Sequence, residues 1–522
     1  MEIFEWLLVL LAGAVFLTAV ARRVGVPYPS LLALGGAALA LLPYAPEFRL
    51  DPELTLALFV APVLLDSAYD TSVRDLRRNW IPVTCLVLVA VGMTTAGVAW
   101  LAHTMVPGMP WAAAVALGAI VAPPDAAAAS AVLKQLKLPH RVMVILEGES
   151  LLNDASALLI YRLAVLAVAS GGLALKQVAP TFALSVVGSV VAGIVLARIS
   201  MALFVRVTDQ SSAIVMQFVT TFGVWILADR LGLSAIVTVV VYAVTVARDA
   251  PRLTPARQRI PSYAVWETVV FVLNVLAFVL IGLQLRPILS ALDADQRVEY
   301  LQVAAAVLGA VVVIRMVWTV IYYSAALVKM RFFGGGNWPG PKGPSFKGGV
   351  IVTWCGMRGI VTLAAAYALP VATADTLAFP YRDLILLCAF CVVVGTLVVQ
   401  GMTLRPLILW LNVKDDRPVD REVHLINQRM TRVALESLDG DDSLESESLR
   451  REFTSLLDGS STMDEQPHGQ SRHDELRALV ITAQRRILLE MRASDEIGDD
   501  AFHLVEERLD WAELNAKGMG QG

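Results

Sequence analysis

Residues 147–154 decide how this sequence is interpreted, and they read Glu147-Gly148-Glu149-Ser150-Leu151-Leu152-Asn153-Asp154. They place three carboxylates and an amide inside the run 142–169, which otherwise has the pattern of a membrane-spanning helix. An ionisable side chain near the bilayer centre costs about 2.5 to 3.5 kcal/mol or more, so it indicates a functional site. If this helix enters at Val142, Asp154 lies about 18 Å along a span of roughly 30 Å, close to the midplane.

The composition is that of a polytopic membrane protein. Hydrophobic residues make up 57 % of the 522 residues, charged residues only 17 %, and the mean hydropathy is +0.64. A soluble enzyme of this length would be far more polar. The four cysteines all fall in apolar segments, which argues against a disulfide framework or a redox pair.

Apolar runs recur along the first 411 residues, and we count thirteen: 6–20, 28–42, 53–68, 80–102, 111–133, 142–169, 177–204, 211–228, 232–247, 262–284, 299–328, 347–369 and 383–411. Eighteen Lys and Arg residues fall in or beside one set of alternate loops and six in the other set. Positive charge favours the cytoplasmic side. We therefore predict a multi-pass protein of the cell membrane with its N-terminus outside and its C-terminus in the cytoplasm.

The chain divides into a transmembrane domain at 1–411 and a polar cytoplasmic tail at 412–522. Apolar residues at spacings of three and four predict an amphipathic helix at 474–491. A less regular pattern predicts a second helix at 499–514, and 459–473 has the composition of a linker. The tail is expected to pack on itself or on a second copy; binding a regulator is the alternative.

The acidic helix carries polar groups on two faces. Helical spacing puts Glu147, Ser150 and Asp154 on one face, with Glu149 and Asn153 on the adjacent one. Such a helix must face a protein interior or an aqueous cavity.

The preceding run contains a predicted break at Pro123, Pro124 and Asp125. Two prolines remove two backbone donors and leave carbonyls of the preceding turn unpaired. Secondary transporters use such discontinuous helices at the midplane to bind ions. The alternative is a proline kink in which Asp125 caps the second half-helix, but a second midplane carboxylate, Asp154, favours an ion site.

A buried arginine occurs in the twelfth run, at Trp354-Cys355-Gly356-Met357-Arg358-Gly359. Arg358 cannot lose its proton and needs a carboxylate partner, for which Glu149 or Glu147 is expected. Further polar candidates in the membrane runs are Asp66, Glu267, Asn274, Gln284 and Arg315.

These residue types suit competition between a proton and a cation for one carboxylate. A buried Asp154 is expected to exchange a proton near neutral pH. Carboxylates, a hydroxyl and backbone carbonyls are ligands for a hard cation. The six histidines lie in loops, at ends or in the tail, so no zinc or redox site is expected. Exchange of a cation for a proton involves no enzyme chemistry, and neither a cofactor nor a nucleic-acid partner is expected.

The segments 148–154, Pro124-Asp125, 356–359 and 282–285 together resemble the monovalent cation/proton antiporters, in the sodium/proton exchanger branch. The resemblance implies an all-α membrane protein with about 13 transmembrane helices in two inverted repeats, with discontinuous helices crossing at the midplane. It also implies a homodimer whose core bundle moves against a dimerisation domain.

The resemblance assigns roles to particular residues. Asp154 would bind the cation and the proton, with Asn153 supporting it, and Asp125, Pro124, Ser150 and Asp66 would supply or orient ligands. Glu149 would pair with Arg358, and Glu147, Glu267 and Arg315 are possible accessories. The chain departs from many relatives in having Pro124-Asp125-Ala126 where they have Thr-Asp-Pro, so a threonine hydroxyl is missing there.

The leading hypothesis is therefore a secondary antiporter that exchanges Na⁺, or else K⁺ or Li⁺, for H⁺ across the lipid bilayer. A cation channel or ion-sensing receptor is the alternative from another class, although no carbonyl filter repeat is present. An intramembrane protease is weaker still, because no Gly-x-Gly-Asp string occurs.

Overall fold

The computed structural model describes residues 2–43, 51–133, 138–170, 175–254, 256–333, 345–371, 379–413 and 418–439, together with shorter pieces of the tail at 443, 446–451, 453–454, 480–488, 490, 505, 509 and 511–512. The chain forms two compact units, Met1–Asp416 and Arg417–Gly522. Throughout the described ranges the regular elements are helices, as predicted.

The first half of the membrane unit contains α1 (Glu2–Val24), α2 (Tyr28–Ala40), α3 (Pro52–Thr55), the π-helical η1 (Leu56–Val60), α4 (Ala61–Asp70), α5 (Val73–Arg78), α6 (Trp80–Thr84), the π-helical η2 (Cys85–Ala90), α7 (Val91–Met105), α8 (Trp111–Val121), α9 (Ala126–Leu133) and α10 (His140–Ser170). The second half contains α11 (Leu175–Phe204), α12 (Gln210–Arg230), α13 (Ala235–Leu253), α14 (Ala256–Leu283), α15 (Leu285–Ser290), α16 (Ala294–Phe333), α17 (Phe346–Trp354), α18 (Ile360–Tyr367) and α19 (Arg382–Leu411).

Each of the thirteen predicted apolar runs coincides with one helix or with two or three successive helical segments. Among the described residues, nine helices are long and apolar enough to cross a membrane by length and composition. The break predicted between residues 229 and 232 is present, since α12 ends at Arg230 and Gly232 adopts a left-handed backbone (φ 68°) in the turn before α13. The full count of thirteen spans and the inverted repeats remain predictions.

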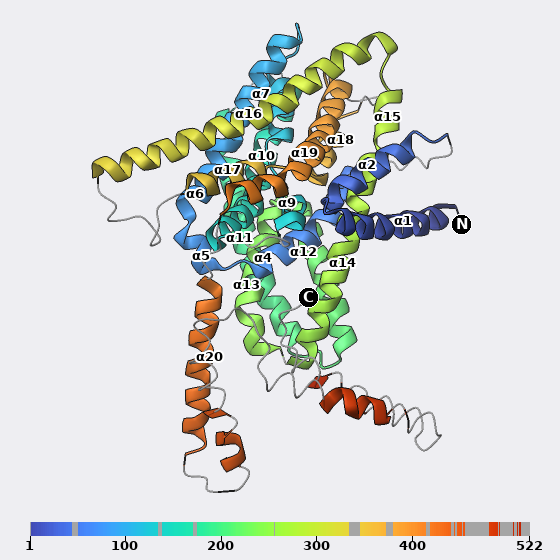
Figure 1. The fold of residues 1–522 in the computed structure, drawn as a ribbon. Coiled ribbons are helices and arrows are strands. Elements are labelled where there is room, and N and C mark those ends of the chain that lie inside the picture. Colours follow the sequence, from blue (N-terminus) through green and yellow to red (C-terminus); the bar gives the residue numbers. More distant parts are fainter. Residues whose placement is uncertain are drawn as a thin grey trace. The chain divides into compact units, whose positions relative to one another are not determined.

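Two of the predicted runs are interrupted helices. The first breaks between α8 and α9, at the two prolines, and the second breaks between α17 and α18, at residues 355–359. In Figure 1, α16 runs as a long helix across α7, with α17 and α19 beside it. α10 packs against both α8 and α17, so the acidic helix lies against both interrupted helices.

The second unit begins with α20 (Pro418–Ser437). Within the predicted helix 474–491, residues 480–488 are helical. The remainder of that segment, most of 499–514 and the predicted linker 459–473 lie outside the described residues.

The start of α10 is held by the short helix α5. His140, the first residue of α10, places Nε2 3.1 Å from Oδ2 of Asp75. Ser72 caps α5 by accepting from the Asp75 amide, and Arg74 Nε lies 3.4 Å from Asp75 Oδ1. Burial raises the pKa of Asp75, but hydrogen bonds from His140 and Ser72 and the charge of Arg74 outweigh it, so the pKa lies below its ordinary value.

This lowered pKa predicts a pH-dependent effect of Asp75→Asn on stability. A carboxylate whose folded pKa is depressed stabilises the fold above its unfolded pKa of about 3.9, and this contribution is lost as the pH falls through the folded pKa. Asp75→Asn should therefore lower the thermal unfolding midpoint in detergent at pH 7, and the difference from wild type should shrink below about pH 4. A difference that stays constant from pH 7 to pH 3 would contradict the lowered pKa of Asp75.

Candidate functional site

Glu149 and Arg315 form a buried ion pair between α10 and α16. Arg315 Nη1 and Nη2 donate to the two carboxylate oxygens of Glu149 at 2.6 and 2.8 Å. The side chains are 4 % and 1 % exposed for Arg315 and Glu149. A bidentate pair of this kind fixes orientation as well as charge, because the guanidinium fork matches the carboxylate.

The predicted partner of Glu149, Arg358, makes other contacts instead. Arg358 is fully buried, and its guanidinium donates to the backbone carbonyls of Val121, Ala122 and Gly356. The prediction that Glu149 pairs with Arg358 is therefore wrong. The physical reason is that α8 ends at Val121, where its last carbonyls have no helical donor, and a cation is favourable at a helix C-terminus.

Arg315 donates hydrogen bonds to the end of the second interrupted helix, as Arg358 does to the end of the first. Its Nε donates to the carbonyl of Thr353 at 3.2 Å and its Nη2 to that of Val352 at 3.1 Å, both in the last turn of α17. The carbonyls at the end of α8 and at the end of α17 thus each accept hydrogen bonds from an arginine side chain. Thr319, one turn along α16, lies against the Thr353 hydroxyl and extends this network.

The two interruptions are joined by a direct hydrogen bond, and the second also bonds to α19. The Asp125 amide donates to the carbonyl of Met357 at 2.6 Å, and the Arg358 amide donates to the Thr396 hydroxyl at 3.0 Å. Sequence reasoning missed Thr396, because a threonine in an apolar run gives no signal of the backbone it will meet.

Both glycines of the 356–359 segment make room for charged side chains. A Cβ at Gly356 would lie 2.7 Å from Cδ and Nε of Arg315. A Cβ at Gly359 would overlap the carboxylate of Asp125. The glycines that the sequence placed beside Arg358 are thus required by Arg315 and Asp125.

Asn153 connects α10 to the first interruption. Its Nδ2 donates to the carbonyl of Pro124 at 2.8 Å, while its Oδ1 is buried and has no hydrogen-bond partner in the described part of the chain. The Pro124 oxygen has a second lone pair beyond the one that Asn153 uses. The Oδ1 of Asn153 and the carbonyl oxygen of Pro124 are thus both available as ligands at this contact.

A cavity of about 10 Å³ lies next to this contact. It is lined by Pro124, Asp125, Ala129, Leu146, Glu149, Ser150 and Cys355. Its size is about that needed for one water-sized occupant. Four of the predicted site residues therefore line a single small cavity.

Asp154 lies one turn beyond Ser150 on α10 and is 8 % exposed. No hydrogen bond or ion pair joins its carboxylate to another described residue, and Asp125 is the charged group that acts on it electrostatically. The structure thus separates the acids of the 147–154 segment, because Glu149 is neutralised by an arginine and Asp154 is not.

Four further predicted residues are not among the described residues that line this cavity: Asp66, Glu147, Glu267 and Gln284. Asp66 is half-buried on α4, which packs mainly against α13 and also contacts α10. Glu267 is exposed on α14, and Glu147 is half-buried on α10. Gln284 accepts a hydrogen bond from the Tyr367 hydroxyl at 2.8 Å, which fits a structural role.

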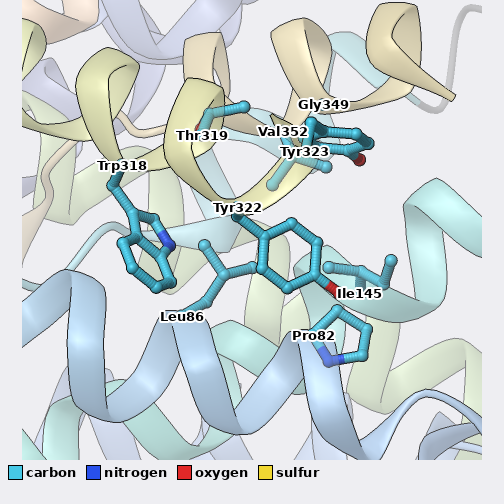
Figure 2. Close-up of a pocket in the computed structure, with 9 residues that line it drawn as sticks. All are labelled: Pro82, Leu86, Ile145, Trp318, Thr319, Tyr322, Tyr323, Gly349 and Val352. Carbon is cyan, nitrogen blue, oxygen red and sulfur yellow. The ribbon is translucent and has the colours of Figure 1, made fainter. Parts of the chain in front are cut away.

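A larger cavity of about 30 Å³ lies one turn along α16 from Arg315. Figure 2 shows the ring of Tyr322 between Pro82 and Leu86, with its hydroxyl directed toward Ile145. None of the described residues that line this cavity carries a carboxylate, so it offers no negative charge to a cation.

The buried ion pair makes a prediction for stability. Glu149→Gln leaves the Arg315 charge buried without its counter-charge, which should cost about 3 to 5 kcal/mol of unfolding free energy. The double variant Glu149→Leu/Arg315→Met should lose less than Arg315→Met alone, because both variants lose the donors to the Val352 and Thr353 carbonyls but only the single variant leaves the Glu149 charge unpaired. The measurement is the detergent unfolding midpoint of each purified variant.

The exposed pair Glu447–Arg451, whose side chains are 60 % and 79 % exposed, provides the control. Glu447→Gln should change the midpoint little, because solvent screens such pairs. Equal losses in Glu149→Gln and Glu447→Gln would refute the buried pair.

Comparison with known proteins finds a matching family and several similar proteins. The family described as sodium/hydrogen exchanger, transmembrane, matches residues 8–410. A sodium, potassium, lithium and rubidium/H⁺ antiporter of Bacillus pumilus is 30 % identical over 84 % of this chain and 66 % of its own length. An uncharacterised Na⁺/H⁺ exchanger of Mycobacterium tuberculosis is 29 % identical over 97 % of this chain and 94 % of its own length.

A solved structure has the same fold. The sodium proton antiporter MjNhaP1 from Methanocaldococcus jannaschii at pH 8 matches with a TM-score of 0.56 and 18 % identity, over 79 % of this chain and 99 % of the other. The family predicted from the sequence is confirmed. With a match that spans almost the whole membrane unit, the chain belongs to the sodium/hydrogen exchanger family.

Proposed function

We propose that the protein is a secondary antiporter that exchanges a monovalent cation, Na⁺ in the first instance, for H⁺ by alternating access, and that Asp154 carries both ions in turn. The observation that carries the proposal is the division of the buried acids. Glu149 is neutralised by Arg315, whereas no described residue pairs with the carboxylate of Asp154. A buried carboxylate without a counter-ion is stabilised by binding either a proton or a cation.

Neighbouring oxygens supply the other ligands in this proposal. Asn153 contributes Oδ1, Pro124 its carbonyl and Ser150 its hydroxyl, while Asp125 provides a second carboxylate. These are hard oxygen ligands, suited to Na⁺, K⁺ or Li⁺. Asp66 remains a proposed ligand that would reach the site from α4.

The orientation and assembly of the protein form part of the proposal. The distribution of Lys and Arg supports an outside N-terminus and a cytoplasmic C-terminus. A homodimer in the cell membrane follows from the resemblance to the family. The tail is proposed to pack on itself or on the second copy, and binding of a regulator is the alternative. The protein performs no covalent chemistry in this account and needs no cofactor.

Potassium is the second cation to consider. The Bacillus pumilus relative is named for sodium, potassium, lithium and rubidium, which favours testing all four ions. A K⁺ or K⁺/Na⁺ exchanger regulated by its tail would use the same carboxylate.

The proposal predicts cation-dependent dissipation of a pH gradient. Purified protein in liposomes with an imposed gradient should release protons when Na⁺, K⁺, Li⁺ or Rb⁺ is added, and Asp154→Asn should abolish the response. The response is followed with a pH-sensitive dye over several pH values, with the full-length chain.

Asp209→Asn is the matched control. Asp209 caps α12 by accepting from the Ser212 amide at 2.8 Å, and asparagine caps a helix about as well. This variant should transport like wild type. Exchange that survives in Asp154→Asn at near the wild-type rate would refute the proposed site, and cation conductance without proton movement would indicate a channel.

A further inference from the structure

The π-helical segment η2 is hydrogen-bonded to the acidic helix α10, close to the proposed ion site. Ser156, two residues after Asp154, places its Oγ 2.9 Å from the carbonyl of Val87. Val87 lies in η2, the π-helical segment between α6 and α7. The wider turn of a π-helix leaves backbone carbonyls accessible, and such segments are frequent at functional sites.

The same hydroxyl also reaches the backbone of Asn153. Ser156 Oγ lies 2.8 Å from the Asn153 carbonyl, one turn back along α10. A hydroxyl has one proton, so it donates to one of the two carbonyls at a time. Asn153 in turn donates to the Pro124 carbonyl at the first interruption.

These contacts form a continuous connection from η2 through α10 to the interrupted helix. Ser156 and Asn153 are three residues apart and share one side of α10. Rotation of α10 about its axis would break the Val87 contact and would displace Asn153 from Pro124. It would also move Asp154 relative to Asp125.

We propose that Ser156 is a positioning residue for the ion site: its hydrogen bond to Val87 fixes the rotation of α10 and thereby the geometry in which Asn153 and Asp154 meet Pro124 and Asp125. This inference rests on the proposed antiport function. Ser156 itself does not bind the cation; it acts through Asn153.

The test compares the cation dependence of Ser156→Ala with that of wild type in the proteoliposome assay. Loss of one hydrogen bond should raise the apparent KM for the cation by roughly three- to tenfold, while the maximal rate changes less. Ser156→Thr keeps the hydroxyl and should restore the KM to within about twofold of wild type. The pH profile should shift in the alanine variant and return in the threonine variant.

Ser200→Ala is the matched control, because Ser200 is a buried serine on α11 that donates to the Leu196 carbonyl at 2.8 Å. It should leave the KM unchanged. Should Ser156→Ala fail to fold, Ser156→Cys replaces it, with a weaker donor and an intermediate KM expected.

Three results would overturn the inference: an unchanged KM in Ser156→Ala, equal KM increases in Ser156→Ala and Ser200→Ala, or no recovery in Ser156→Thr. Each leaves the proposed function standing as long as wild type exchanges cations for protons and Asp154→Asn does not. Failure of wild type to exchange would instead overturn the function itself.

Discussion

The rest of the structure depends on one constraint: in the membrane interior, charges need counter-charges and backbone carbonyls need hydrogen-bond donors other than water. Interrupting a membrane helix leaves its last carbonyls without donors, and each unsatisfied group costs several kcal/mol in hydrocarbon, as a typical figure. Here two arginines meet this need. Arg358 donates to the end of α8, and Arg315 donates to the end of α17 while it also pairs with Glu149.

This arrangement is the basis for proposing Asp154 as the acid that exchanges ions. The Glu149–Arg315 pair is a stable neutral unit that links α10 to α16 and α17. Arg358 spreads its charge over carbonyls and so does not compensate for another acid of α10. Asp154 therefore lies in the interior with a second carboxylate, Asp125, acting on it and with uncommitted oxygens nearby.

Much of this was predictable from the sequence. Apolar runs located the helices, because a helix must be apolar to cross a membrane, and the Pro123-Pro124 pair located the first interruption. The second interruption, at the glycines around Arg358, was not located from the sequence, because glycine permits a break without requiring one. The partner of Glu149 was not predictable, since periodicity tells which face of a helix a residue occupies and not which helix packs there.

Other features were hidden for related reasons. The π-helical turn at residues 85–90 and its contact with Ser156 follow from tertiary packing, and the local sequence is simply apolar. The only sequence signal for Asp66 and Glu267 is that they are charged residues in apolar runs. The structure places Glu267 at an exposed position on α14 and leaves Asp66 on a helix that packs mainly elsewhere.

The central claim is that a cation and a proton compete for the carboxylate of Asp154. The most direct measurement is calorimetric titration of the purified protein with Na⁺ in buffers that differ in protonation enthalpy. The heats should depend on the buffer, with up to about one proton released per cation bound, because the cation displaces the proton from one carboxylate. Binding heats that are the same in every buffer would contradict it.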